Sequence, residues 1–380
     1  MREVKHVCVD FNEDRLHRVE SLLNTYVNHA FPGAHLTVVS CGDVVLDVLL
    51  GYAEITPLRR GLTRDMLFDL ASLTKVLVTS IIYGKLVEEG LVSLRQKVSE
   101  IVPEFVKTVA GSSEIKERIR LWMLLSHASG LPPWMPFFKL ANSREEVFSE
   151  AVKVFPASTP GEVVTYSDIN YIILTYIAEL ITGERIDRLF EKYVVKALNL
   201  RRTSYNPLTR GFSKDEIVAT EVDERRGGTL VGVVHDENAY VMNGVSGHAG
   251  LFSSVEDSAK LIVELIRSYR GESDALLSPV ITQTFLRPWA CDSNLCYGIG
   301  WRVNSHGKVD FDQLTDLWVS TSFSHTGFTG TSIWFAPELD LAILLYTNRV
   351  HPSRANEAIV KVRPLIHNAV LSSIKGLRGV

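Results

Sequence analysis

The two ends of the chain carry strand patterns, whereas its middle does not. Near the N-terminus, two runs rich in β-branched and aliphatic residues, 36–40 and 44–50, are joined by Cys41-Gly42-Asp43, which has the composition of a hairpin turn. Towards the C-terminus, four more such runs follow, at 298–303, 317–323, 332–336 and 341–346. We therefore expect one antiparallel sheet assembled from both ends of the chain.

The region between these runs has helical periodicity. Apolar residues recur at three- and four-residue spacing in 118–125, 144–154, 171–181 and 186–198. The run from Leu73 to Val87 is apolar around most of its circumference, which predicts a buried helix. Further helices are expected after Asn12, near 255–269 and near the C-terminus, where Pro364 should kink or shorten the last one.

This order of elements predicts an α/β (α+β) fold with two parts. Residues 1–80 and 235–380 would form a discontinuous sheet domain, and residues 81–234 a mainly helical domain inserted into it. We expect a site for a small-molecule substrate in the cleft between the two parts.

Composition argues against several classes of partner. The chain of 380 residues has 40 Lys and Arg against 44 Asp and Glu, interspersed along the sequence, so a nucleic-acid partner is not expected. No run reaches the ~18 apolar residues of a membrane span, and the first residues lack the apolar core of a secretory signal. We therefore expect no membrane partner and a cytoplasmic location. The four cysteines lack metal-binding spacing and are predicted to be reduced thiols.

A serine followed three residues later by a lysine occurs four times, at Ser72, Ser113, Ser305 and Ser372. Only Ser72 begins a buried helix, where free N–H groups and the positive helix end would stabilise an oxyanion. The spacing places Lys75 on the same helix face. A lysine carried into an apolar helix must find a partner or lose its proton, and either outcome suits proton transfer from serine. The alternative is a plain N-cap serine beside a lysine that reaches the surface.

Two further motifs lie downstream. Tyr166-Ser167-Asp168 follows a turn that would place the tyrosine at the start of a helix, from where its hydroxyl can point into a cleft. His325-Thr326-Gly327 lies beside a predicted strand, with glycines that let a substrate backbone approach the sheet edge. Each triplet is weak by itself, since a half-buried aromatic residue and a turn glycine beside an incidental histidine would look the same.

Taken in order, Ser72-Leu73-Thr74-Lys75, Tyr166-Ser167-Asp168 and His325-Thr326-Gly327 resemble the three motifs of the class C β-lactamase and penicillin-binding superfamily. The resemblance spans about residues 12–375 and implies a β-lactamase/transpeptidase-like fold. It also implies a serine hydrolase with Ser72 as nucleophile and with Lys75 and Tyr166 sharing the general base and acid work. The backbone N–H groups of Ser72 and Phe328 would form the oxyanion hole. Neither a metal nor an organic cofactor is implied.

Two positions depart from the pattern of this superfamily. The second motif ends in Asp168 instead of asparagine, and an ionised aspartate only accepts hydrogen bonds. The third motif begins with His325 instead of the lysine of β-lactamases, and histidine is mostly neutral at pH 7. Both changes disfavour β-lactam hydrolysis. The predicted function is therefore hydrolysis of a small ester or amide, as in esterase and D-amino-acid peptidase relatives. A true β-lactamase, a DD-carboxypeptidase and a non-catalytic scaffold are the alternatives.

The remaining candidates concern ligand binding. Besides the motif residues Asp168, His325, Thr326 and Gly327, we expect Asn348, Arg349 and Arg354 to contact substrate, because they follow the last strand near where class C enzymes hold a carboxylate. A zinc site built from His235, Asp236, His248, His325 and His351 is not expected, since none has the i,i+3 or i,i+4 helical pairing of common zinc sites. The role of residues 234–239 does not follow from the sequence, and the oligomeric state is left open.

Overall fold

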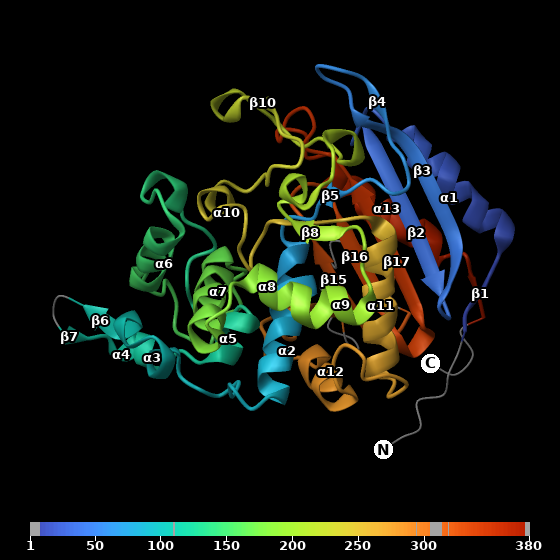
Figure 1. Cartoon of the computed structure of the whole chain (residues 1–380). Coiled ribbons are helices and arrows are strands. Elements are labelled where there is room, and N and C mark those ends of the chain that lie inside the picture. Colours follow the sequence, from blue (N-terminus) through green and yellow to red (C-terminus); the bar gives the residue numbers. More distant parts are fainter. Residues whose placement is uncertain (1–7, 109–110, 294, 305–313, 318, 377–380) are drawn as a thin grey trace.

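The computed structural model describes residues 8–108, 111–293, 295–304, 314–317 and 319–376. Within them, a nine-stranded antiparallel sheet has the order β12-β13-β14-β15-β16-β17-β2-β3-β4. The bounds are β2 Gly33–Ser40, β3 Asp43–Glu54, β4 Arg60–Gly61, β12 Ala290–Cys291, β13 Cys296–Tyr297, β14 Arg302–Asn304, β15 Ser322–Thr326, β16 Ser332–Ala336 and β17 Leu341–Thr347. Because β17 pairs with β2, the two ends of the chain meet in one sheet, as predicted (Figure 1).

The helices cover both faces of this sheet and fill the middle of the chain. Their bounds are α1 Glu13–Thr25, α2 Ser80–Glu88, α3 Val98–Ile101, α4 Glu114–Glu117, α5 Leu121–Leu125, α6 Arg144–Lys153, α7 Asp168–Thr182, α8 Ile186–Phe190, α9 Lys196–Leu198, α10 Glu237–Val241, α11 Val255–Tyr269, α12 Pro279–Leu286 and α13 Ile359–Leu371. Figure 1 shows α3 to α7 gathered away from the large sheet. The mixed α/β fold class predicted from the sequence is confirmed.

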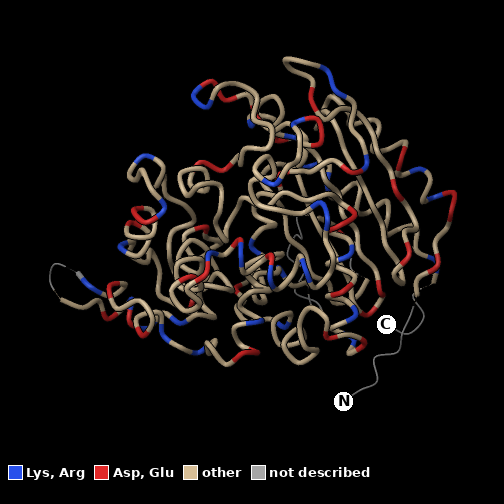
Figure 2. The backbone as a smooth tube through the Cα atoms, in the orientation of Figure 1, with Lys and Arg blue, Asp and Glu red and all other residues tan. Residues whose placement is uncertain are grey.

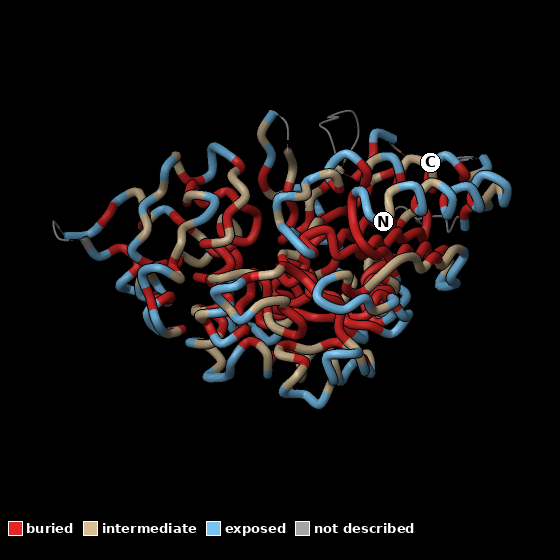
Figure 3. The backbone as a smooth tube through the Cα atoms, turned by 90° about the horizontal axis from the view of Figure 1, so that it is seen from above, coloured by how far each residue is buried: buried red, intermediate tan, exposed pale blue. Residues whose placement is uncertain are grey.

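Alternation along the strands divides the core into two layers. Trp334 of β16 packs in one hydrophobic cluster with α1 and α13, whereas the next residue, Phe335, packs in the other cluster with α2 and α11. This follows from the two-residue repeat of a strand, which points successive side chains to opposite faces. Figure 3 shows the buried residues gathered in the interior of the molecule and the exposed ones along its outer turns.

Short pairings complete the fold. They join β1 Asp10–Phe11 to β18 Ile374–Lys375, β6 Lys107–Thr108 to β7 Gly111–Ser112, and β9 Val222–Asp223 to β10 Gly228–Thr229. A three-stranded sheet has β11 Leu251–Ser253 between β5 Phe68–Asp69 and β8 Thr203–Tyr205. This small sheet matters for function, because β5 leads directly into Ser72.

Some predicted boundaries need correction. The strand expected over 298–303 begins only at Arg302, because Gly300 has a φ of 85° and turns the chain. The strand expected over 317–323 is shifted to Ser322–Thr326, so that His325 and Thr326 lie within β15. Pro364 does not end α13, whose buried face continues on both sides of the proline.

The helix predicted after Ser72 is confirmed and is buried. A π-helical turn, Lys75–Thr79, precedes α2, and all five of its side chains are buried. Single π-helical turns are frequent at functional sites, since they displace side chains from the regular helical positions.

The prediction of reduced thiols is wrong. Cys8 is bonded to Cys41 in the turn between β2 and β3, and Cys291 is bonded to Cys296, which lies opposite it in the β12–β13 pair. The spacing of the cysteines could not show this, because the fold brings Cys8 to a turn 33 residues further along the chain. Disulfides persist mainly in oxidising surroundings, although intracellular proteins of hyperthermophiles are an exception. The cytoplasmic location stays a prediction.

Charges are spread over the molecule. Figure 2 shows basic and acidic residues alternating along the backbone, with no segment of one sign covering a face in that view. In the described ranges, none of the helices combines the length and hydropathy needed to cross a bilayer.

Candidate active site

Ser72 is presented by a tightly held turn at the end of β5. Ala71, directly before it, has a φ of 46°, and its N–H donates to the Asp69 carboxylate at 2.8 Å. The other Asp69 oxygen accepts from the backbone N–H of His235 at 2.7 Å. Asp69 is buried, and burial raises its pKa above the ordinary value. This carboxylate thus joins the serine turn to the segment around His235.

The loop after β15 is tied to the same turn. Thr329 donates its hydroxyl to the Asp69 carbonyl at 2.6 Å, and Thr331 donates to the Leu70 carbonyl at 3.2 Å. A Cβ on Gly327 would lie 2.4 Å from the Leu70 carbonyl oxygen, so only glycine allows this approach. The third motif is therefore held directly against the residues that precede Ser72.

Lys75 has three polar partners and no exposure to solvent. Its Nζ donates to Ser72 Oγ at 2.8 Å and to the His248 carbonyl at 2.9 Å, and it pairs with Asp168 Oδ1 at 2.7 Å. The sequence left two alternatives for Lys75, a lysine that reaches the surface and a buried lysine with a partner, and the structure shows the buried one. Asp168, which departs from the family pattern, supplies the opposite charge that this burial requires.

A second serine-lysine pair shows what the alternative arrangement looks like. Ser113 Oγ accepts from the backbone N–H of Lys116 at 3.4 Å and so caps the short helix α4, while the Lys116 ammonium donates to the Val152 carbonyl. At Ser72, the lysine side chain instead contacts the serine hydroxyl. The pair that begins at Ser305 lies outside the described residues.

Tyr166 lies two residues before α7, as its motif predicted, and its ring lies beside Lys75. Lys75 Nζ is 5.1 Å from the ring centroid. Burial, followed by the nearby Asp168 charge, raises the pKa of the Tyr166 hydroxyl well above 10, against the opposing effect of the Ser72 hydroxyl. The phenol is therefore neutral in the resting site.

His127 contacts the residues directly before and after Tyr166 and also the Tyr166 ring. Its carbonyl accepts from the Thr165 N–H at 2.8 Å, its Nδ1 accepts from the Ser167 N–H at 3.1 Å, and its ring centroid lies 4.6 Å from that of Tyr166. An Nδ1 that accepts carries no proton, so the ring is the neutral tautomer protonated at Nε2. Burial, together with the Lys75 charge, lowers the pKa of His127 well below 6.5, which is consistent with this tautomer.

His325 is also neutral. Burial, followed by the Lys75 charge, lowers its pKa to about 3. Its Nδ1–H donates to the Thr326 carbonyl at 2.9 Å, which leaves Nε2 as an acceptor with no hydrogen-bond partner among the described residues. The cation that β-lactamases carry at this position therefore has no equivalent here at neutral pH.

These buried histidines predict a loss of stability in weak acid. The unfolded chain binds protons at His127 and His325 as the pH falls below about 6.5, whereas the folded chain does not until much lower pH. The free energy of unfolding therefore decreases as the pH falls from 6.5 towards 4, by about 1.4 kcal/mol per pH unit for each histidine. Urea unfolding at pH 7.0, 6.0 and 5.0 measures this, and a free energy of unfolding that is constant over this range would refute it.

A cavity of about 600 Å³ opens beside Ser72. The predicted site residues that line it are Ser72, Tyr166, Asp168, His325, Thr326, Phe328 and Arg354. Residues that were not predicted complete the wall, among them Trp134, Asp236, Glu237, Tyr297 and Arg302. They come from loops and short elements, for which periodicity gives no information.

Three predicted substrate contacts do not line the cavity: Gly327, which lies against the Leu70 carbonyl, Asn348 and Arg349. The Asn348 side chain accepts from the Gly33 N–H at 2.9 Å and donates to the carbonyls of β3, so it joins strands. Arg349 donates to the Phe328 carbonyl at 2.7 Å and lies over the Phe328 ring, with the guanidinium carbon 4.2 Å from the centroid. Neither side chain is among those lining the cavity, and Arg349 instead supports the loop that carries Phe328.

The charged groups on the wall are paired. Asp236 accepts from His248 Nε2 at 2.9 Å, and although burial alone would raise its pKa, the His248 interaction holds that pKa well below the ordinary value. His235 pairs with Glu221 at 3.0 Å. Across the described ranges, no three His, Cys, Asp or Glu side chains are grouped so that they could hold a metal ion.

Two residues lining the cavity have backbone N–H groups without hydrogen-bond partners among the described residues. In the described part of the chain, neither the Ser72 amide nor the Phe328 amide donates a hydrogen bond. The ties from Thr329 and Thr331 hold the two segments together. Unpaired N–H groups beside a nucleophile are what an oxyanion requires.

Comparison with known proteins agrees with this geometry. Residues 17–364 match the model of the Beta-lactamase family. The chain belongs to the β-lactamase family. A curated relative from Salmonella schwarzengrund (strain CVM19633), named putative D-alanyl-D-alanine carboxypeptidase, is 32% identical, and the match covers 92% of this chain and 86% of the relative.

Solved structures show the same fold. The octameric penicillin-binding protein homologue from Pyrococcus abyssi matches with a TM-score of 0.70 at 20% identity, covering 94% of this chain and 79% of that one. EstCE1, a hydrolase with promiscuous acyltransferase activity, matches with a TM-score of 0.71 at 17% identity, covering 94% and 98%. The resemblance predicted from the motifs is thus confirmed, and the solved structures share the predicted fold.

Proposed function

We propose that this β-lactamase-family protein hydrolyses a small ester or amide through an acyl-enzyme on Ser72. The contact that carries the proposal is the 2.8 Å hydrogen bond between Lys75 Nζ and Ser72 Oγ, with Tyr166 lining the same cavity as Ser72. A non-catalytic scaffold does not require a buried lysine that is hydrogen-bonded to a serine hydroxyl. A nucleophile needs such a proton acceptor.

The reaction would proceed in two halves. Ser72 Oγ bonds to the acyl carbon while its proton passes to Lys75, and Lys75 passes one of its own protons to Asp168, 2.7 Å away. The carbonyl oxygen becomes an oxyanion between the amides of Ser72 and Phe328. The bond to the leaving group then breaks, and Tyr166 protonates that group and regains its proton from the Lys75–Asp168 pair. Water releases the acyl group by the reverse sequence.

Asp168 is central to this scheme. In the resting site, Lys75 lies against a carboxylate and Tyr166 is a neutral phenol, so neither is ready to accept a proton without passing one on. A carboxylate beside the ammonium supplies the final acceptor. An asparagine at this position could not take that proton.

A comparison of three substrates tests the proposal. Wild type and Ser72→Ala should be assayed with p-nitrophenyl esters, D-aminoacyl amides and a chromogenic cephalosporin. We expect turnover of an ester or amide, lost in Ser72→Ala, and little hydrolysis of the cephalosporin, because neutral His325 offers no charge for its carboxylate. Efficient cephalosporin hydrolysis without ester or amide turnover would contradict the proposal.

A DD-carboxypeptidase is the second candidate. It is favoured by the name of the 32% identical relative, whose match covers most of both chains. Release of D-alanine from a peptide ending in D-alanyl-D-alanine distinguishes it from an esterase or amidase.

His127 should act as a positioning residue for Tyr166. We expect His127→Ala to lower kcat by about 10²-fold, because loss of the Ser167 contact lets the phenol move. His127→Asn offers an amide oxygen near the place of Nδ1 and should recover most of this loss. Steady-state kinetics with thermal unfolding as a control measures both variants. Equal losses of kcat in His127→Ala and His127→Asn would show that His127 contributes packing and does not position Tyr166.

A further inference from the structure

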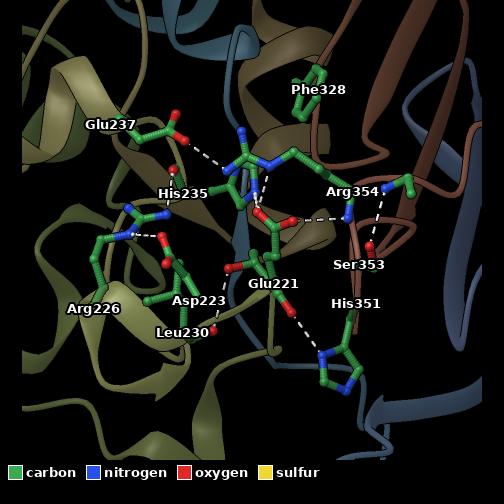
Figure 4. Close-up of polar contacts among 12 residues, drawn as sticks. Glu221, Asp223, Arg226, Leu230, His235, Glu237, Phe328, His351, Ser353 and Arg354 are labelled. Atoms are coloured by element: carbon green, nitrogen blue, oxygen red, sulfur yellow. Dashed lines mark hydrogen bonds and ion pairs between the residues drawn. The ribbon is translucent and has the colours of Figure 1, made fainter. Parts of the chain in front are cut away.

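Arg354 lies in the cavity wall with its guanidinium between two carboxylates. Its Nε donates to Glu221 at 2.5 Å and its Nη2 donates to Glu237 at 2.8 Å, while its backbone N–H donates to the other Glu221 oxygen at 3.1 Å. Figure 4 shows the side chain reaching between these two glutamates. The arginine is therefore held by both of its neighbours at once.

The two glutamates differ in how they are placed. Glu221 is buried and also pairs with His235, and these hydrogen bonds outweigh burial and lower its pKa to about 2. It is a fixed part of the fold. Glu237 is the first residue of α10 and lines the cavity, where its other cationic neighbour is the mostly exposed Arg225 at 3.9 Å.

This wall adjoins the oxyanion side of the cavity. The His235 ring stacks on the Phe328 ring with a centroid distance of 5.6 Å, and Phe328 supplies one of the unpaired amides. A substrate group lying on this side of Ser72 meets the carboxylate of Glu237, while two guanidinium donors of Arg354, at Nε and Nη2, are already engaged by carboxylates.

We propose that Glu237 determines specificity, because by occupying Arg354 it excludes substrates that carry a carboxylate beside the reacting acyl group and favours their neutral counterparts. The inference rests on the proposed acyl-hydrolase function. Two carboxylates around one guanidinium repel a third, whereas an arginine with a free pair of N–H donors binds a carboxylate by charge-assisted hydrogen bonds. Without the Glu237 carboxylate, the Arg354 guanidinium would bind a substrate carboxylate instead of excluding it.

Two matched pairs of esters test this, since the carboxylate can lie on either side of the scissile bond. The leaving-group pair is m-carboxyphenyl acetate and m-carbamoylphenyl acetate. The acyl-group pair is the p-nitrophenyl monoester of glutaric acid and p-nitrophenyl valerate. We expect wild type to prefer the neutral ester, and Glu237→Gln and Glu237→Ala to shift the ratio of kcat/KM towards the carboxylate by about tenfold in at least one pair.

The controls separate this inference from the chemistry at Ser72. Glu224→Gln makes the same charge change on an exposed residue of the neighbouring segment and should leave both ratios unchanged. Arg354→Ala in the Glu237→Ala background should abolish the gain. Unchanged ratios in both Glu237 variants, or a gain that survives loss of Arg354, would overturn the inference while neutral-ester turnover still supports the proposed function. Absence of all ester turnover in wild type would overturn the inference, and absence of both ester and amide turnover would overturn the proposed function as well.

Discussion

Lys75→Met should lower kcat/KM for an ester substrate by about 10³-fold or more, near the upper end of what positioned proton transfer contributes. Methionine keeps most of the length and apolar character of the lysine stem, so the buried helix should retain its packing. What is lost is the Nζ contact with Ser72 Oγ at 2.8 Å. Steady-state kinetics on a p-nitrophenyl ester measures the change.

Lys75→Met also leaves the Asp168 carboxylate without its cationic partner, so it should lower stability as well as activity. A double variant separates the two effects. Removing one partner of a buried ion pair costs about 3–5 kcal/mol, so the single variant should unfold at lower denaturant concentration. The double variant Lys75→Met/Asp168→Asn carries no unpaired charge there and should regain stability without regaining turnover. Recovery of turnover in the double variant would exclude Lys75 from proton transfer.

Tyr166→Phe should lower turnover by about 10²–10⁴-fold while the protein stays folded. The ring keeps its contact with the His127 ring, so packing beside Ser72 is unchanged, and only the hydroxyl is removed. Kinetics and thermal unfolding measured on the same preparation test this. Near-normal turnover would remove Tyr166 from the mechanism, and a large loss of stability would make the kinetic result a folding effect.

The contact between Ser72 and Lys75 could be predicted from the sequence because it depends on local order. A serine before a buried helix, with a lysine one turn later, fixes the Ser72–Lys75 contact within four residues. The sheet was predictable for a similar reason, since strand patterns at both ends leave few partners for β2 other than β17.

Other features depend on the path of the whole chain. Arg349 follows the last strand as a substrate-binding arginine would, yet its side chain turns to the Phe328 carbonyl. The bond between Cys8 and Cys41 requires knowing that the N-terminal segment returns to the first hairpin. His127 was not predicted as a site residue, because its hydrogen bond with Ser167 joins segments 40 residues apart in the chain.

The covalent state of Ser72 tests the central claim most directly. Wild type, Ser72→Ala and Tyr166→Phe should be treated with a covalent serine-directed probe and analysed by intact mass and by peptide mapping. A single adduct on the peptide containing Ser72, absent in Ser72→Ala and formed more slowly in Tyr166→Phe, is the predicted result. Labelling that survives in Ser72→Ala would contradict the assignment of Ser72 as the nucleophile.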